Sequence, residues 1–108
     1  MTMWYMLDEE NNPVPALDAT EYFNWRDQNE NKRVVKQETV NNKYVSTVFL
    51  GMDHNTDPYN NNGSPVLFET MVFPDKENYS EMYCKRCCFY DDALLMHQEA
   101  IQWVKGGE

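Results

Sequence analysis

Acidic and imidazole side chains stand beside two apolar segments of the chain. Asp53 and His54 directly follow the apolar run 44–52, and Glu69 lies inside the apolar run 66–73. Imidazole and carboxyl groups are common general acids and bases, and a neighbouring carboxylate fixes the tautomer of an imidazole. Both runs are rich in Val, Phe and Thr, so they are expected to pair as strands that bring these three residues to the edge of the core. The pattern indicates a candidate site for proton transfer.

Two further residues, His97 and Arg86, are expected at this candidate site because of their positions on the last helix and on a strand. His97 falls at the centre of the apolar face of the last helix, so it is expected to face the sheet. Asp53, Glu69 or Thr70 would then provide partners for its ring nitrogens. Arg86 is the expected partner of Glu69, in a bidentate contact that either positions the sheet or holds an anion. A structural role for His97, which orients the helix on the sheet, is favoured over catalysis.

The same residues allow an alternative function, the binding or hydrolysis of a nucleotide or another phosphate compound. His54 and His97 would act as general acid and base, and Arg86 would hold the anion. The Asn-rich loop 53–65 would be the lid. This hypothesis requires both imidazoles and the guanidinium to open into one pocket. The catalytic candidates are therefore His54, His97 and Glu69, and the ligand- or anion-binding candidates are Asp53, Arg86 and Thr70.

The loop after the first apolar run carries the beginning of a calcium-binding pattern. Asp53, Asn55 and Asp57 match the first three ligand positions of an EF-hand loop. Pro58 stands where that loop requires a glycine, and Ser64 stands where the bidentate glutamate belongs. The pattern is therefore incomplete, and no calcium site is predicted.

Three cysteines, Cys84, Cys87 and Cys88, lie close together in the sequence. The C-x-x-C spacing matches half of a zinc site, but no second Cys or His pair completes it. Cys84 and Cys87 would point to opposite faces of an extended strand, which favours small buried thiols over a chelate. No metal or other cofactor is predicted. An odd number of clustered thiols also fits a reducing compartment, the cytoplasm.

Local signals predict the first strand and the first helix. The short strand 4–7 is expected to end before Pro13 and Pro15, because proline cannot continue a hydrogen-bonded ladder. A helix over 19–28 follows, since Asp18 and Glu21 form a capping box. Leu17, the residue before the cap, is expected to pack on Tyr22.

Alternation and turn residues predict the remaining elements. The strand 32–40 is expected to form a hairpin with 44–52 through the turn Asn41-Asn42. The other expected elements are strands 66–73 and 82–88 and a final helix 91–104. The predicted fold class is α+β: residues 1–108 form one domain, with an antiparallel sheet of four to five strands and two helices packed on it, in the order β-α-β-β-β-β-α.

The charge balance indicates which partners the chain would attract. Nine basic and eighteen acidic residues give a net charge of −9, which disfavours direct binding to nucleic acid or to anionic membranes. A protein with a basic surface would be attracted instead. From the N-terminal sequence, neither a signal peptide nor a transmembrane segment is expected. Within the long loop 53–65, Asp57, Tyr59 and Asn61 are candidate interface residues.

Two strand motifs and one helix motif resemble a known group of proteins. The segments VSTVFLGMDHN and PVLFETMVF, followed by Arg86 and a helix with Ala93 and His97, are similar to a widespread family of small bacteriophage and prophage proteins. The resemblance covers about residues 34–104. This chain departs from the family pattern at the start of the last helix, where Phe89 replaces a hydroxyl residue and Tyr90 replaces tryptophan. Met96 also replaces a small residue before the histidine.

The resemblance implies a phage origin and a place in the host cytoplasm. Small acidic phage proteins often bind and disable a host protein, including components of restriction, CRISPR or signalling defences. We therefore expect a phage accessory protein with a basic host partner, such as a counter-defence inhibitor. A nucleotide- or phosphate-binding protein or hydrolase is the alternative, and a virion or assembly component that self-associates as a homo-oligomer is the second alternative.

Overall fold

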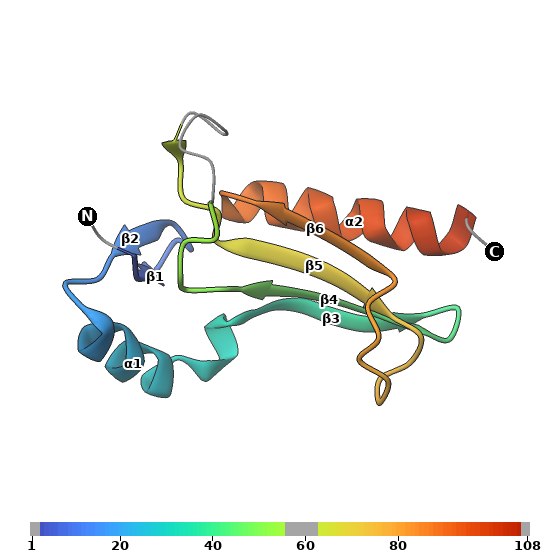
Figure 1. Cartoon of the computed structure of the whole chain (residues 1–108), viewed down its shortest axis with the longest axis horizontal. Coiled ribbons are helices and arrows are strands. Elements are labelled where there is room, and N and C mark those ends of the chain that lie inside the picture. Colours follow the sequence, from blue (N-terminus) through green and yellow to red (C-terminus); the bar gives the residue numbers. More distant parts are fainter. Residues whose placement is uncertain (1–2, 56–62, 107–108) are drawn as a thin grey trace.

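Four consecutive strands form one antiparallel sheet in the order β3-β4-β5-β6 (Figure 1). The computed structural model describes residues 3–55 and 63–106. The strands are β3 (Val34–Val40), β4 (Lys43–Phe49), β5 (Phe68–Phe73) and β6 (Tyr83–Cys87), and helix α2 (Tyr90–Gly106) follows them. The prediction of a single α+β domain with an antiparallel sheet is confirmed.

Side chains alternate between the two faces of this sheet, because successive residues of an extended strand point in opposite directions. On β4, Val45, Thr47 and Phe49 are buried against α2. Tyr44 and Val48 point to the opposite face and are only half-buried. Figure 1 shows α2 along one face of the sheet, with α1 beyond one end of the sheet. The sheet therefore has one face covered by α2 and one face that neither helix covers.

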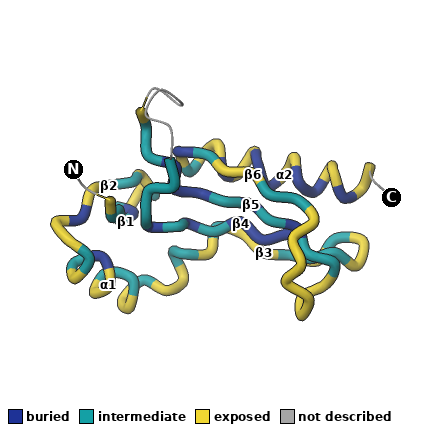
Figure 2. Tube along the Cα trace, viewed as in Figure 1, coloured by how far each residue is buried: buried dark blue, intermediate teal, exposed yellow. Residues whose placement is uncertain are grey.

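Helix α2 contacts the sheet through residues spaced three or four apart, the period of one helical face. Figure 2 shows the alternation of buried and exposed residues along this helix. His97, which was predicted at the centre of the apolar face, is among the buried residues. None of the helices within residues 3–55 and 63–106 is long and apolar enough to cross a membrane. The buried residues of α2 are Ala93, Met96, His97, Ala100, Ile101 and Val104.

The turn between β3 and β4 is the predicted Asn41-Asn42 turn. Both asparagines have positive φ angles, 49° for Asn41 and 67° for Asn42. Two consecutive left-handed residues are typical of the type I′ turn, whose twist matches that of a two-stranded hairpin. Asparagine tolerates this conformation better than most residues with a side chain. The turn fixes the register, in which Val40 faces Lys43 and Glu38 faces Val45.

A second, smaller sheet departs from the predicted order. Strand β1 (Tyr5–Leu7) pairs with β2 (Pro13–Pro15), the segment whose prolines were expected to exclude β structure. The Ala16 amide donates to the Trp4 carbonyl, and the Asp8 amide donates to the Asn12 carbonyl. Along β2, residues whose N–H groups face β1 therefore alternate with residues whose N–H groups point away from it. Both prolines occupy positions of the second kind, where the missing N–H group breaks no bond between the two strands.

Helix α1 (Ala19–Gln28) begins at the predicted capping box. The Glu21 amide donates to Asp18 Oδ1 over 2.9 Å, and the Leu17 amide donates to Glu21 Oε1 over 3.0 Å. The expected contact of Leu17 with Tyr22 does not form, because Leu17 is 89% exposed. Tyr22 instead stacks on Trp4, with ring centroids 5.0 Å apart. Helix α1 thus packs against the small sheet and does not lie on the large one.

Gly51 connects the two sheets in the segment that follows β4. Its carbonyl accepts a hydrogen bond of 2.7 Å from the Tyr5 amide. Its φ angle is 79°, and a Cβ atom at this position would collide with the Tyr22 ring. Glycine is therefore required here for both its conformation and its lack of a side chain. Close backbone approach at Gly51 lets the aromatic core around Tyr22 continue into the large sheet.

Candidate functional site

His97 is the centre of a buried polar chain between α2 and the sheet. Its Nδ1 lies 2.7 Å from the Thr47 hydroxyl, and that hydroxyl lies 2.5 Å from the Thr70 hydroxyl. Its Nε2 lies 2.7 Å from Glu38 Oε2. A carboxylate can only accept, so Nε2 carries a proton. In the neutral ring Nδ1 then accepts from Thr47, whose oxygen accepts from Thr70.

The order carboxylate, imidazole, hydroxyl is also the order of a catalytic triad. A triad requires its hydroxyl to be within reach of a substrate. Here Thr47, Thr70 and His97 each have 0% of their surface exposed. The geometry therefore supports the structural interpretation of His97, in which the ring joins α2 to β3 and β4.

Two members of this buried polar chain, Thr47 and Glu38, were not among the partners that the sequence indicated. Thr70 belongs to it, but through Thr47 and not by direct contact with the ring. Neither Asp53 nor Glu69 contributes, and Glu38 takes the place of the expected carboxylate. The Asn41-Asn42 turn could have indicated Glu38, because the register of this hairpin places Glu38 opposite the buried Val45.

Glu38 keeps its charge more readily than an ordinary glutamate. The hydrogen bond from His97 lowers the pKa of the Glu38 carboxyl, and partial desolvation opposes this effect. The Lys36 ammonium, 3.5 Å from Glu38 Oε2, lowers the pKa further. The carboxylate is thus the form that the surrounding groups stabilise.

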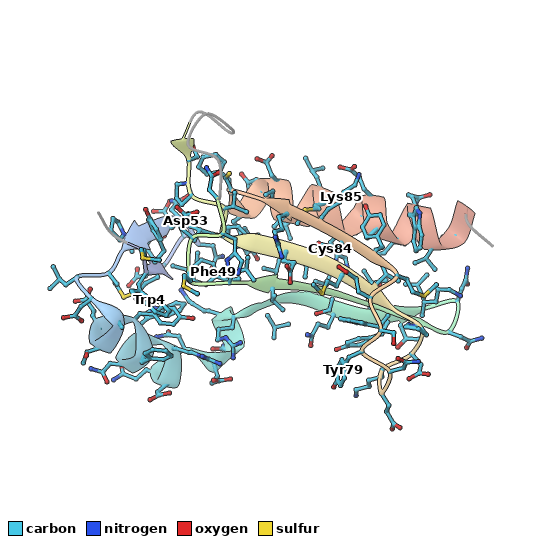
Figure 3. The ribbon with its side chains drawn as sticks, in the orientation of Figure 1. Trp4, Phe49, Asp53, Tyr79, Cys84 and Lys85 are labelled. Atoms are coloured by element: carbon cyan, nitrogen blue, oxygen red, sulfur yellow. The ribbon has the colours of Figure 1, made fainter. Side chains whose placement is uncertain are left out.

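Asp53 and His54 organise the base of the loop 53–65. Asp53 Oδ1 accepts from the amides of Asn55 and Val66, at 2.8 and 2.9 Å. His54 Nδ1 lies 2.7 Å from the Met52 carbonyl oxygen, and the His54 amide donates to the Val66 carbonyl. These contacts join the segments before and after the loop. Figure 3 shows Asp53 near this junction.

Glu69 and Arg86 form the predicted ion pair on the face of the sheet opposite α2, but through one hydrogen bond and not through the expected bidentate contact. Arg86 Nε lies 2.8 Å from Glu69 Oε2. The hydrogen bond to Glu69 raises the pKa of the Arg86 guanidinium above its ordinary value. The Arg86 side chain is 45% exposed, so the pair is screened by water and contributes little to stability.

The structure does not bring the phosphate-site candidates into one pocket. His97 belongs to α2 and is buried between this helix and the sheet, whereas Arg86 lies on the opposite face of the sheet. His54 lies at the base of the loop, where its Nδ1 contacts the backbone. The three candidate interface residues Asp57, Tyr59 and Asn61 lie outside the described residues.

The cysteines are held as thiols. Burial, followed by the Glu69 carboxylate, raises the pKa of Cys84 to about 11, and burial also raises the pKa of Cys87 to about 11. A thiol binds metals and attacks electrophiles far less readily than a thiolate. No group of three or more His, Cys, Asp or Glu residues suited to a metal occurs in the parts of the chain that the structure describes.

A groove that the sequence did not indicate lies on the face opposite α2. It has a volume of about 630 Å³, and its floor is formed by outward-facing residues of β3, β4 and β5. The loop between β5 and β6 forms one wall and contributes Lys76, Glu77 and Tyr79. Figure 3 shows Tyr79 in this loop. The apolar lining residues are Tyr44, Val48, Met71, Phe73 and Tyr79.

Sequence reasoning missed the groove because its parts come from three strands and a loop. The alternation within β4 indicated an outer face, but the position of the wall depends on how the loop 74–82 folds back. No protein-family model, curated protein or solved structure matches this chain.

Proposed function

We propose that the chain is a phage-encoded accessory protein that binds a basic surface of a host protein through the groove on the uncovered face of its sheet. The proposed partner is a host defence component, and inhibition follows from occupation of its surface. The observation that carries the proposal is the groove itself, where aromatic side chains and carboxylates gather between the sheet and the loop that follows β5.

Binding is favoured over catalysis because the candidate catalytic groups have structural contacts. His97 is buried between Thr47 and Glu38. His54 Nδ1 contacts the Met52 carbonyl oxygen, and Glu69 is paired with Arg86. The groove instead combines partly buried aromatic rings with polar groups at its margin, a composition typical of protein interfaces. The resemblance of residues 34–104 to bacteriophage proteins supports the phage origin.

The net charge supports the choice of a basic partner. A chain with a net charge of −9 attracts cationic surfaces and accelerates their encounter at low ionic strength. Defence proteins that handle nucleic acids carry such surfaces, because they must neutralise phosphates. An acidic protein that occupies this surface would compete with the nucleic acid.

Affinity capture from host lysate with matched variants tests this function. The wild-type chain should retain a basic protein in stoichiometric amount, and Phe73→Ser in the groove should reduce that amount at least about tenfold, the loss expected for a central aromatic contact. Leu95→Ala should capture as the wild type does, because Leu95 is 63% exposed on α2 and away from the groove. Circular dichroism of each variant confirms that it is folded.

Absence of a stoichiometric partner, or equal capture by wild type and Phe73→Ser, would refute the proposal. Light scattering of the purified chain adds a separate outcome. A dimer that Phe73→Ser dissociates would show that the groove binds a second copy of this chain and not a host protein.

A further inference from the structure

We propose that the groove recognises an arginine side chain of the partner, held against Phe73 and Tyr79 and paired with Glu77. This inference rests on the proposed function and specifies the chemistry of the contact. Four features of the groove support it: the geometry of its rings, the order of its wall, its charge, and its polar floor.

The first feature is a corner of aromatic rings. Phe73 and Tyr79 have ring centroids 5.7 Å apart and planes at 83° to each other. Tyr44 continues the wall beside Phe73, with centroids 6.5 Å apart and planes at 26°. A guanidinium group stacks on such ring faces, because the π-electrons attract the cation. A guanidinium also lies over a ring within the chain's own fold, where Arg26 Cζ is 6.0 Å from the centroid of the Phe23 ring.

The second feature is the order of the loop that carries Tyr79. This side chain is 75% exposed, so burial within the fold does not explain its position beside Phe73. Asp75 Oδ1 accepts from the Glu77 amide over 2.8 Å, and Asn78 Oδ1 accepts from the Ser80 amide over 3.0 Å. These bonds shape the backbone on both sides of the ring. A ring that is already in place loses less conformational entropy when a ligand binds.

The third feature is the charge at the edge of the groove. Two carboxylates line it, and Glu69 is already paired with Arg86. Glu77 is exposed and has no ion-pair partner within the described part of the chain. Lys76 also lines the groove, and its single positive charge equals the negative charge of Glu77. Glu77 is therefore the acidic group that is available to a cation from outside.

The fourth feature is the polar floor. Gln37 and Ser46 lie side by side, with Gln37 Nε2 donating to the Ser46 hydroxyl over 2.9 Å. The Gln37 amide oxygen and the Ser46 hydroxyl provide acceptors for the several N–H donors of a guanidinium. A lysine ammonium would use the carboxylate but would not stack in the same planar way. The combination favours arginine.

The probe for this inference is N-acetyl-arginine amide, titrated into the full chain labelled with nitrogen-15 and followed by NMR. Saturable shift changes should be confined to the amides of β4, β5 and the loop 74–82. N-acetyl-citrulline amide has nearly the same shape without the charge and should produce no saturable changes. Equal changes with citrulline, or arginine-induced changes spread over α1 and α2, would overturn the inference.

Variants locate the contact within the groove. Tyr79→Leu and Glu77→Gln should each weaken the binding of the arginine probe at least about fivefold, since each removes one attraction to the cation. Glu81→Gln is the matched control, because it removes the same charge from the same loop at a residue that does not line the groove. It should change the affinity less than about twofold. Lys76→Met should strengthen binding, because it removes a repelling charge.

The inference and the proposed function can fail separately. If the arginine probe does not bind while Phe73→Ser still abolishes capture of the host protein, the groove binds its partner by other contacts and only the arginine inference is wrong. If the probe binds as predicted while no host protein is captured, the cation site stands and the proposed function is wrong.

Discussion

His97 Nε2 and Glu38 Oε2 lie 2.7 Å apart, although the two residues are 59 positions apart in the sequence. The contact joins the last helix to the edge strand of the sheet. Because Glu38 also lies beside Lys36, it links a fully buried imidazole to the solvent-exposed side of β3. The stability of the fold should therefore depend on this polar chain as well as on the apolar core.

The first prediction concerns the buried polar chain. His97→Gln should lower the free energy of unfolding by about 2–3 kcal/mol, because glutamine cannot contact Thr47 and Glu38 together and leaves a buried hydroxyl unpaired. Urea unfolding followed by circular dichroism measures the change. Gln98→Ala, on the exposed side of the same helix, should change stability by less than about 0.5 kcal/mol. Equal stability of both variants would contradict a structural role for His97.

The second prediction concerns acid sensitivity. The folded state lowers the pKa of Glu38 through the His97 hydrogen bond, so it binds a proton there less readily than the unfolded chain. This contribution to stability is fully present above the pKa of an ordinary glutamate, about 4.3, and is lost as the pH falls through the lower folded value. Glu38→Gln should therefore flatten the loss of stability between about pH 5 and pH 3. Urea midpoints measured across this range give the dependence of stability on pH for the wild type and for Glu38→Gln. Equal slopes for the two proteins would contradict this role of Glu38.

The third prediction concerns the thiols. With pKa values of about 11, Cys84 and Cys87 contain little thiolate at pH 8. In the folded chain they should react with iodoacetamide more than about tenfold more slowly than in the urea-unfolded chain, whose cysteines have pKa values near 8.5. Mass spectrometry of the labelled peptides gives the rates. A rate at Cys84 that matches the unfolded chain would show that its thiol is not shielded.

The fourth prediction concerns the connection between the sheets. Gly51→Ala should destabilise the fold by about 2–4 kcal/mol, because the new methyl group both strains a positive φ and collides with the Tyr22 ring. Gly106→Ala is the matched control, since a Cβ there meets no atom within 4 Å. Its stability should be unchanged or raised by up to about 1 kcal/mol. Thermal unfolding measures both variants. Equal melting temperatures for Gly51→Ala and Gly106→Ala would refute the requirement for glycine at position 51.

Elements governed by neighbours in the sequence could be predicted well. The capping box at Asp18, the Asn41-Asn42 turn and the buried position of His97 all follow from spacings within a few residues. The Glu69–Arg86 pair also follows, because adjacent strands place residues of one face side by side.

Features governed by distant segments could not be predicted from these patterns. The contact of Glu38 with His97 requires the helix to cross the edge strand at a particular height. The pairing of Pro13–Pro15 with β1 depends on which backbone groups face the partner strand. The groove depends on a loop that folds over the sheet, and the spacing of apolar residues within a strand carries no information about that loop.

The alternation of side chains along β4 has a consequence for how this protein can change. Tyr44, Ser46 and Val48 line the groove, while Val45, Thr47 and Phe49 lie against the core beneath α2. One strand thus lines the groove on one side and the core on the other. Substitutions at the even-numbered positions can change the lining of the groove without disturbing the residues that hold the helix. A designer who wants a new binder can therefore vary one side of this strand and leave the scaffold intact.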